Sequence, residues 1–253
     1  MRKSIIALGV LAAAASVPAQ AEYLFGFGSM YVDYQVWDQG FGNDDDNFGG
    51  DISKRNQAVI GIDGGAVFDW GQIYGFYDYE GVDRAGDDRG ASAKGTIHYN
   101  LTESGVSLYA QVYNTDADKS NFHEQNRVLG LGYTGLKGDG WGFTPFIGAH
   151  QINTKDNTGA NGGMVGWVGY YATEIAGEKF TFSSWGEYEF ARNDAYSKAQ
   201  STSSESWGLN GSLNAMWNFH ENWSTGVLYR FTVNKLARKD YQDLLIYRVQ
   251  YTF

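Results

Sequence analysis

The amino-acid sequence predicts an all-β protein: a transmembrane, antiparallel, up-and-down β-barrel of about twelve strands. Apolar and polar residues alternate along a series of segments, short and long connections alternate between those segments, and the last segment ends in an aromatic residue, Phe253. Strands of a membrane barrel turn successive side chains toward lipid and lumen, so they give a period of two without a long apolar run. A mean hydropathy of −0.40 is compatible with such a chain.

The N-terminal residues have the layout of a secretory signal peptide. Two basic residues precede an apolar stretch over residues 5–15, and Ala21 closes an Ala-x-Ala sequence. The apolar stretch is shorter than the roughly 20 residues that a membrane-spanning helix needs. We therefore expect cleavage after Ala21, with residues 1–21 removed and residues 22–253 forming one barrel domain.

The alternation is clearest in the last three segments, where every second residue is apolar or small. About 9–11 tilted residues suffice for a strand to cross a membrane, and each of these segments is that long. Aromatic residues gather at the segment ends, as expected for girdles at the two membrane interfaces. The predicted strands are residues 23–37, 56–68, 70–80, 91–101, 106–115, 124–134, 142–152, 163–175, 179–192, 206–219, 223–234 and 243–253.

The lengths of the connections predict the topology. Long connections follow the odd-numbered strands and short ones follow the even-numbered strands, which is the order of a barrel with both termini in the periplasm and its long loops outside the cell. The expected location is the outer membrane of a Gram-negative bacterium. The short connections are residues 69, 102–105, 135–141, 176–178 and 220–222, and the long ones are residues 38–55, 81–90, 116–123, 153–162, 193–205 and 235–242.

One predicted strand, residues 124–134, carries a charge among its apolar positions. The alternation places Arg127 on the same face as Leu129, Leu131 and Tyr133. Either Arg127 lies at the extracellular rim, or the strand contains a bulge. We prefer the rim, because a long side chain can extend its charged end into polar surroundings there.

The composition argues against several classes of function. The net charge of −10 does not suit nucleic-acid binding, which needs a basic face. The chain has no cysteine, and its four histidines do not have the spacing of a metal site, so we expect no disulfide, metal or other cofactor. A glycine pattern over residues 130–135 lies on an alternating strand with no helix after it, and no serine–histidine pair is evident. An enzyme is therefore not expected.

The polar faces of the predicted strands line the lumen. They carry both signs of charge and many aromatic side chains, a combination that suits flat, uncharged solutes, because rings stack on a planar ligand and polar groups bind its edge. Packing of the interior of a small barrel is the alternative role for the same side chains. The predicted channel-lining residues are Asp33, Gln72, Tyr74, Phe76, Asp78, Tyr109, Tyr113, Glu187, Arg230 and Arg248.

One segment carries a family resemblance. Residues 69–78 read DWGQIYGFYD, with an Asp-Trp pair, a Tyr-Gly pair, an aromatic residue and an aspartate in fixed order. This pattern resembles the second hairpin of the Tsx/OmpK family of nucleoside-specific outer-membrane channels. The resemblance implies a monomeric twelve-stranded barrel with a narrow channel for nucleosides and deoxynucleosides, in which Tyr74, Phe76 and Asp78 line the channel.

The predicted function is passive, selective diffusion of nucleosides, without chemistry. One alternative is a plugged barrel that acts as a surface receptor or adhesion protein through its acidic loops, with phage among its partners; another is a channel for a sugar or short peptide. Residues 44–46, Asp83, Asp87 and Asp88 could bind divalent cations shared with lipopolysaccharide, although a solvated charge run is the preferred interpretation. Further expected partners are outer-membrane lipid and the barrel-assembly machinery, which would recognise the terminal Phe253.

Overall fold

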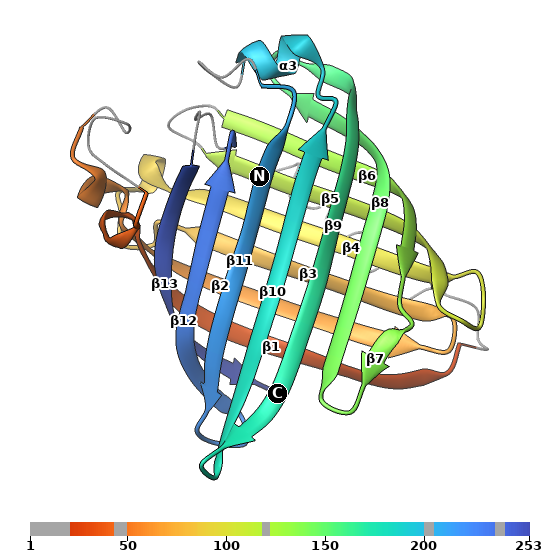
Figure 1. Ribbon diagram of the computed structural model, residues 1–253. Coiled ribbons are helices and arrows are strands. Elements are labelled where there is room, and N and C mark those ends of the chain that lie inside the picture. Colours follow the sequence, from red (N-terminus) through yellow and green to blue (C-terminus); the bar gives the residue numbers. More distant parts are fainter. Residues whose placement is uncertain (1–20, 43–49, 118–121, 200–204, 236–240) are drawn as a thin grey trace.

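The computed structural model describes residues 21–42, 50–117, 122–199, 205–235 and 241–253, which form a closed antiparallel β-barrel (Figure 1). Consecutive strands pair around the ring, and the pairs β1–β13 and β6–β8 close it. The short strand β7 continues β6 along the same edge of β8, so the ring is twelve strands wide. The strands are β1 (Tyr23–Val36), β2 (Gln57–Phe68), β3 (Gly71–Glu80), β4 (Gly90–Asn100), β5 (Val106–Ala117), β6 (Phe122–Tyr133), β7 (Leu136–Gly138), β8 (Trp141–Thr154), β9 (Thr158–Ile175), β10 (Glu178–Phe190), β11 (Gly208–Asn218), β12 (Trp223–Val233) and β13 (Tyr241–Thr252).

Alternation gives the barrel an apolar outer wall. Outward side chains such as Val32, Leu129 and Val249 are 54%, 60% and 47% exposed. On β1, which carries Val32, the side chains of Ser29 and Asp33 face inward and are 0% and 3% exposed. A continuous band of exposed apolar side chains suits a lipid environment, and the predicted all-β barrel with twelve spanning strands is confirmed.

The two walls of the barrel cross each other. In Figure 1 the steep strands β9 to β13 pass in front of the shallower strands β1 to β6. The tight turns at residues 176–177 and 219–222 lie at one end, which we call the turn end, and the helix α3 (Asp194–Ala199) lies at the other, which we call the loop end. Among the described residues, no helix has the length and apolar character to cross a membrane.

Three predicted connections differ from the structure. The predicted turn 135–141 contains β7, which leaves only residues 139–140 to reverse the chain. The predicted long loop 153–162 is a tight hairpin, because the Thr154 hydroxyl accepts the N–H of Asn157 and the two backbones pair. The predicted loop 193–205 contains α3, whose first turn is capped by the Asn193 side chain.

Arg127 lies on the outer wall in the loop-end half of β6, and no register shift interrupts the pairing of β6 with β5 or β8. The bulge alternative is therefore wrong, and Arg127 lies near the middle of an uninterrupted strand rather than at its terminal residues. Its guanidinium donates to the side-chain oxygens of Gln125 and Gln151, with Nε–Oε1 and Nη1–Oε1 distances of 2.8 and 3.2 Å. These partners satisfy a charge that faces away from the lumen.

The connection between β1 and β2 folds back onto the barrel. Its two 3₁₀ turns, Trp37–Gln39 and Ile52–Arg55, bury Trp37 and Ile52 against inward side chains at the loop end. Burial of these two side chains removes apolar surface from water and holds the connection over the mouth of the barrel. The inward side chains that they contact are Leu228, Leu244 and Ile246.

The same connection is fixed to the outer wall. Asp243 is 0% exposed, and its carboxylate accepts the N–H groups of Phe41 and Gly42, each at 2.8 Å, and the hydroxyl of Tyr229 at 2.7 Å. Hydrogen bonds to an ionised carboxylate are among the stronger ones in proteins. This part of the predicted long loop is therefore anchored to β12 and β13.

Candidate functional site

The inner face of the barrel is the candidate site. Directly opposed residues in antiparallel strands share a face, so the register fixes which side chains point inward. All ten predicted channel-lining residues occupy inward positions: Asp33 on β1; Gln72, Tyr74, Phe76 and Asp78 on β3; Tyr109 and Tyr113 on β5; Glu187 on β10; Arg230 on β12; and Arg248 on β13.

The first group of inward side chains spans the seam between the first and last strands. Arg248 donates Nε and Nη2 hydrogen bonds to the two carboxylate oxygens of Asp33, both at 2.7 Å. Its guanidinium carbon lies 3.6 Å from the centroid of the Tyr31 ring, and the Tyr31 hydroxyl donates to Asp78 Oδ1 at 2.5 Å. Gly61 leaves the space, because a Cβ there would lie 2.2 Å from the Tyr31 ring. We call Tyr31, Asp33, Asp78 and Arg248 the seam cluster.

Aromatic and polar side chains continue from the seam cluster toward the turn end. Ser29 donates to Asp63, and the Tyr74 hydroxyl donates to Asp63 Oδ2 at 3.3 Å. The Tyr74 ring centroid lies 6.3 Å from that of Phe27, which is 48% exposed. Gln72 occupies the next inward position on β3. This wall offers both ring faces and hydrogen-bonding groups to a solute.

An ion pair crosses the lumen. Lys94 Nζ on β4 lies 2.5 Å from Glu187 Oε1 on β10, and Gln111 Nε2 donates to the same oxygen at 2.9 Å. Strands β4 and β10 lie on nearly opposite walls of the ring. Lys94 Nζ also lies 5.5 and 5.8 Å from the ring centroids of Trp185 and Tyr113. We call Lys94, Gln111 and Glu187 the cross-lumen bridge, and it marks a constriction.

Two of the predicted aromatic residues flank the bridge, and a third is packed into the wall. Phe76 and Tyr113 lie on either side of Lys94 in the register, with ring centroids 6.4 Å apart. Tyr109 is only 3% exposed, and its ring stacks on Phe146 with a centroid distance of 4.0 Å. Its position suits packing of the wall, whereas Phe76 and Tyr113 remain partly exposed to the lumen.

Arg230 differs from the other inward-facing arginines and from Lys94. Its Nε makes a long hydrogen bond of 3.4 Å to Asn210 Oδ1, and among the described residues no carboxylate lies within ion-pair distance of it. The strand that carries it, β12, lies directly opposite β5, which carries Tyr113, in the ring. The cations that do have carboxylate partners are Lys94, Arg192, Lys235 and Arg248.

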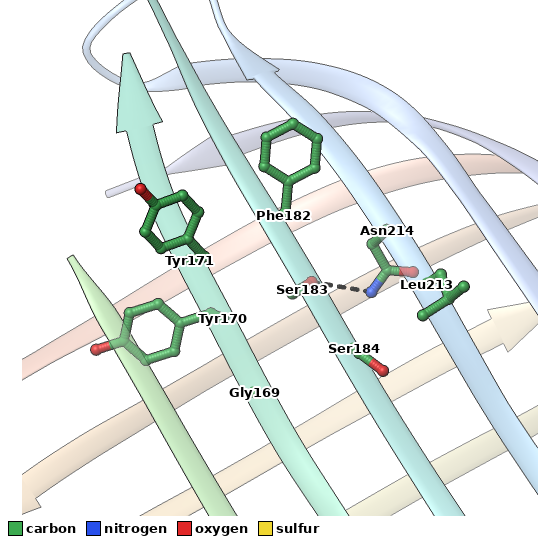
Figure 2. Close-up of a pocket in the computed structure, with 8 residues that line it drawn as sticks. All are labelled: Gly169, Tyr170, Tyr171, Phe182, Ser183, Ser184, Leu213 and Asn214. Carbon is green, nitrogen blue, oxygen red and sulfur yellow. Dashed lines mark hydrogen bonds between the residues drawn. The ribbon is translucent and has the colours of Figure 1, made fainter. Parts of the chain in front are cut away.

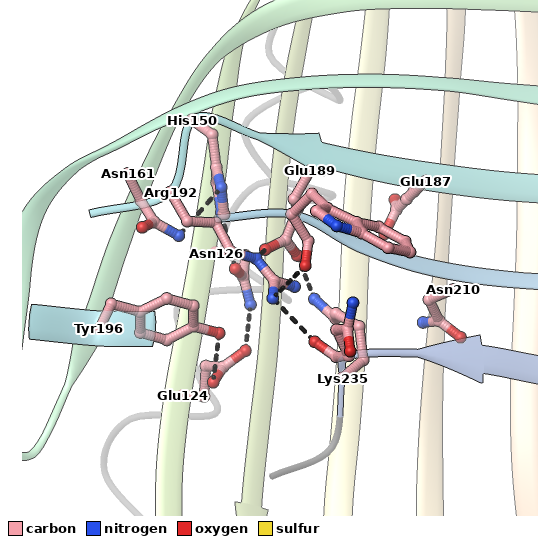
Figure 3. Close-up of polar contacts among 12 residues, drawn as sticks. Glu124, Asn126, His150, Asn161, Glu187, Glu189, Arg192, Tyr196, Asn210 and Lys235 are labelled. Atoms are coloured by element: carbon pink, nitrogen blue, oxygen red, sulfur yellow. Dashed lines mark hydrogen bonds and ion pairs between the residues drawn. The ribbon is translucent and has the colours of Figure 1, made fainter. Parts of the chain in front are cut away.

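A further polar cluster at the loop end was not predicted (Figure 3). Glu189 accepts Arg192 Nε at 2.7 Å and also pairs with Lys235. The Tyr196 side chain of α3 is 1% exposed and donates its hydroxyl to Glu124 Oε2 on β6 at 3.1 Å. Burial, followed by the charge of Glu124, raises the pKa of the Tyr196 hydroxyl well above its usual value, so it remains a donor. The cluster holds α3 over part of the mouth.

Histidine and asparagine side chains extend this cluster along the wall. His150 Nε2 lies 2.7 Å from Asn126 Oδ1, and Asn161 Nδ2 lies 3.4 Å from His150 Nδ1. The only sequence signal for the cluster was an inward glutamate, Glu189, at the end of an alternating segment with an arginine three residues later. Its other members come from three strands and two connections, which no local pattern brings together.

The loops give no metal site within the described part of the chain, where no group of three His, Cys, Asp or Glu side chains is arranged to hold an ion. Asp83 instead accepts the backbone N–H of Ala58 at 2.9 Å. Residues 44–46 lie outside the described residues. A shallow apolar groove lies outside the lumen, between Tyr171, Phe182 and Leu213 on the outer wall (Figure 2).

The fold and the sequence both match known channels. The solved structure of the NanC porin superposes with a TM-score of 0.51 at 10% identity, covering 89% of this chain and 98% of that one. An outer-membrane channel from Pseudomonas putida F1 gives 0.43 at 13% identity, covering 94% and 99%. The family model described as nucleoside-specific channel-forming protein, Tsx, matches residues 30–253. The chain therefore belongs to the Tsx family of nucleoside-specific outer-membrane channels.

Proposed function

We propose that a nucleoside crosses the lumen between the seam cluster and the cross-lumen bridge. The observation that carries this proposal is the position of Phe76 and Tyr113, two partly exposed rings beside the constriction. A base that leaves water can stack on these rings and on Tyr74, since a stacked base gains about 1–3 kcal/mol per aromatic side chain. As the nucleoside moves along the lumen, it exchanges a stacking contact with one ring for a contact with the next.

Polar groups of the same wall would bind the ribose and the edge of the base. The carboxylates of Asp33 and Asp78 are held by Arg248 and Tyr31, so they present fixed acceptors, and Gln72 supplies an amide nearer the turn end. Tyr109 shapes the wall without stacking on the solute. Binding must stay weak at every position, because a tight site would prevent release.

Single-channel conductance in a planar bilayer tests this route. Nucleosides should block the wild-type conductance saturably, and Phe76→Ala should weaken the block by about tenfold, from the stacking energy of one side chain. Tyr77→Ala is the matched control, because Tyr77 is the next residue on β3 and faces outward. Equal block of both variants and the wild type would remove the stacking step from the proposal.

A plugged barrel is the second candidate. The cross-lumen bridge and the α3 cap both obstruct the lumen, and this observation favours a receptor function through the loops. Correctly folded protein that shows no conductance would support the second candidate. Measurable conductance that nucleosides do not affect would instead support a different solute.

The orientation, processing and partners of the barrel are also part of the proposal. We propose that residues 1–21 are a cleaved signal peptide, that both termini face the periplasm and that the loop end faces outward, toward lipopolysaccharide. The alternating β13 with its terminal Phe253 supports recognition by the assembly machinery, and the barrel is expected to work as a monomer. Mass spectrometry of protein from membranes should find Glu22 as the first residue, and protease added to intact cells should cut only loop-end residues.

A further inference from the structure

Within the described part of the chain, the guanidinium of Arg230 faces the lumen with no partner for its two terminal nitrogens. Arg230 is partly exposed to the lumen, and among the described residues its guanidinium makes one hydrogen bond, the 3.4 Å contact from Nε to Asn210 Oδ1. The four paired cations of the lumen each lie within 2.7 Å of a carboxylate oxygen. The two terminal nitrogens of Arg230 are therefore available as donors in a way that those of the four paired cations are not.

The position of Arg230 suits contact with a stacked base. It faces inward from β12, directly opposite β5, which carries Tyr113. In the register, Ser212 lies between Arg230 and Trp185, and the Trp185 ring centroid lies 5.5 Å from Lys94 Nζ, so Arg230 lies near the level of the cross-lumen bridge. Figure 3 shows Asn210 and Glu187 on this wall. A ring held against Phe76 or Tyr113 would therefore present its edge toward Arg230.

The electrostatics favour a neutral acceptor over an anion. Inward carboxylates outnumber inward cations, so a phosphate would meet net repulsion along the path. A guanidinium presents two parallel N–H donors, which match two adjacent acceptor atoms on a planar group. Among the described residues, the inward carboxylates are Asp33, Asp63, Asp78, Glu80, Glu124, Glu174, Glu187 and Glu189, against Lys94, Lys137, Lys179, Arg192, Arg230, Lys235 and Arg248.

We propose that Arg230 is a specificity-determining residue that selects 6-oxopurine nucleosides over 6-aminopurine nucleosides. The oxygen at position 6 and the nitrogen at position 7 of a 6-oxopurine form the adjacent acceptor pair that arginine binds with both donors. A 6-amino group places a donor where the oxygen would be, so one N–H of Arg230 would face another N–H. The inference rests on the proposed route and specifies which bases it favours.

Inosine and adenosine are the matched probes, because they share the ribose and the purine ring and differ only at position 6 and its neighbouring nitrogen. In wild-type protein, inosine should block conductance at about fivefold lower concentration than adenosine, the low end for a two-donor contact in a solvated site. Arg230→Met should reduce this ratio to about one, because it weakens block by inosine more than block by adenosine. Arg230→Lys keeps the charge without the fork and should give an intermediate ratio.

Two controls separate this role from a structural one. Arg127→Met makes the same substitution on the outer wall and should keep the fivefold ratio. Circular dichroism and thermal melting report whether each variant forms the barrel, and Arg230→Lys keeps the test valid if Arg230→Met does not fold.

Four outcomes would overturn the inference. Equal block by inosine and adenosine in the wild type would refute the selectivity while leaving the nucleoside route intact. An unchanged ratio in both Arg230 variants would assign the selectivity to another residue. Stronger block by inosine 5′-monophosphate than by inosine would identify an anion site instead. Absence of block by any nucleoside would refute the route itself, and the inference with it.

Discussion

Removing one charge of the cross-lumen bridge should lower the free energy of unfolding more than removing both charges together. Lys94 and Glu187 are 2.5 Å apart, with side chains 15% and 13% exposed. Two unit charges about 4 Å apart attract by about 4 kcal/mol at an effective dielectric constant of about 20. Glu187→Gln leaves Lys94 without its counter-charge in a poorly solvated lumen. A fully buried pair would lose about 3–5 kcal/mol, so about 2 kcal/mol is expected for this partly solvated one.

A double-mutant cycle measures the coupling. Lys94→Met and Glu187→Gln should each lower the free energy of unfolding by about 2 kcal/mol, and the double variant by about 1 kcal/mol, which gives a coupling of about 3 kcal/mol. Equilibrium urea unfolding of barrels inserted in lipid vesicles provides these values. Asp116→Asn is the control, because the Asp116–His123 contact joins adjacent strands on the outer wall, and its loss should cost under about 1 kcal/mol.

The same variants report on the constriction. The double variant removes both ends of a contact that spans the lumen, so its single-channel conductance should exceed that of the wild type. Additive unfolding energies, with a coupling below about 0.5 kcal/mol, would show that the two charges do not interact across the lumen. An unchanged conductance in the double variant would show that the bridge does not limit the pore.

The remaining predictions concern the seam and the mouth. Gly61→Ala should destabilise the barrel by about 1–3 kcal/mol, because the added Cβ would lie 2.2 Å from the Tyr31 ring, whereas Gly86→Ala, which meets no atom within 4 Å, should have little effect on urea unfolding. Tyr196→Phe removes the hydrogen bond to Glu124 and should lower the free energy of unfolding by about 1 kcal/mol at neutral pH. Burial raises the pKa of the Tyr196 hydroxyl, so the unfolded chain loses that proton first and the stabilisation declines as pH rises above about 10. The stability difference between wild type and Tyr196→Phe should therefore narrow in alkaline urea titrations; a difference that widens would contradict the assignment.

The alternation of the sequence predicted the barrel and its two faces, because a period of two is a local property of each strand. It placed Asp33 and Arg248 on the inner face correctly. Their pairing depends on the register of the first strand with the last, which are joined through the whole chain. The Lys94–Glu187 contact spans 93 residues in sequence. It depends on the distance between β4 and β10 across the closed barrel, which no local sequence pattern determines.

The mouth was less predictable for a related reason. A polar connection such as residues 193–205 has the composition of a solvated loop, yet α3 forms there because Tyr196 finds an acceptor on a distant strand. Trp37 was assigned to the end of a strand, and its burial against β12 and β13 depends on the return of the following connection. Such placements follow from tertiary contacts rather than from propensity.

The polar group around Arg127 has a consequence for how the barrel sits in the bilayer. On β6 the outward side chains are apolar at Leu131 and Leu129 but polar at Arg127 and Gln125, in the half of the strand nearer the loop end. On β10, by contrast, outward aromatic rings occur from Phe180 at the turn end to Phe190 at the loop end. The hydrophobic belt therefore extends less far toward the loop end on β6 than on β10. A bilayer of uniform thickness matches an uneven belt only if the barrel axis tilts away from the membrane normal or the lipid thins locally beside β6.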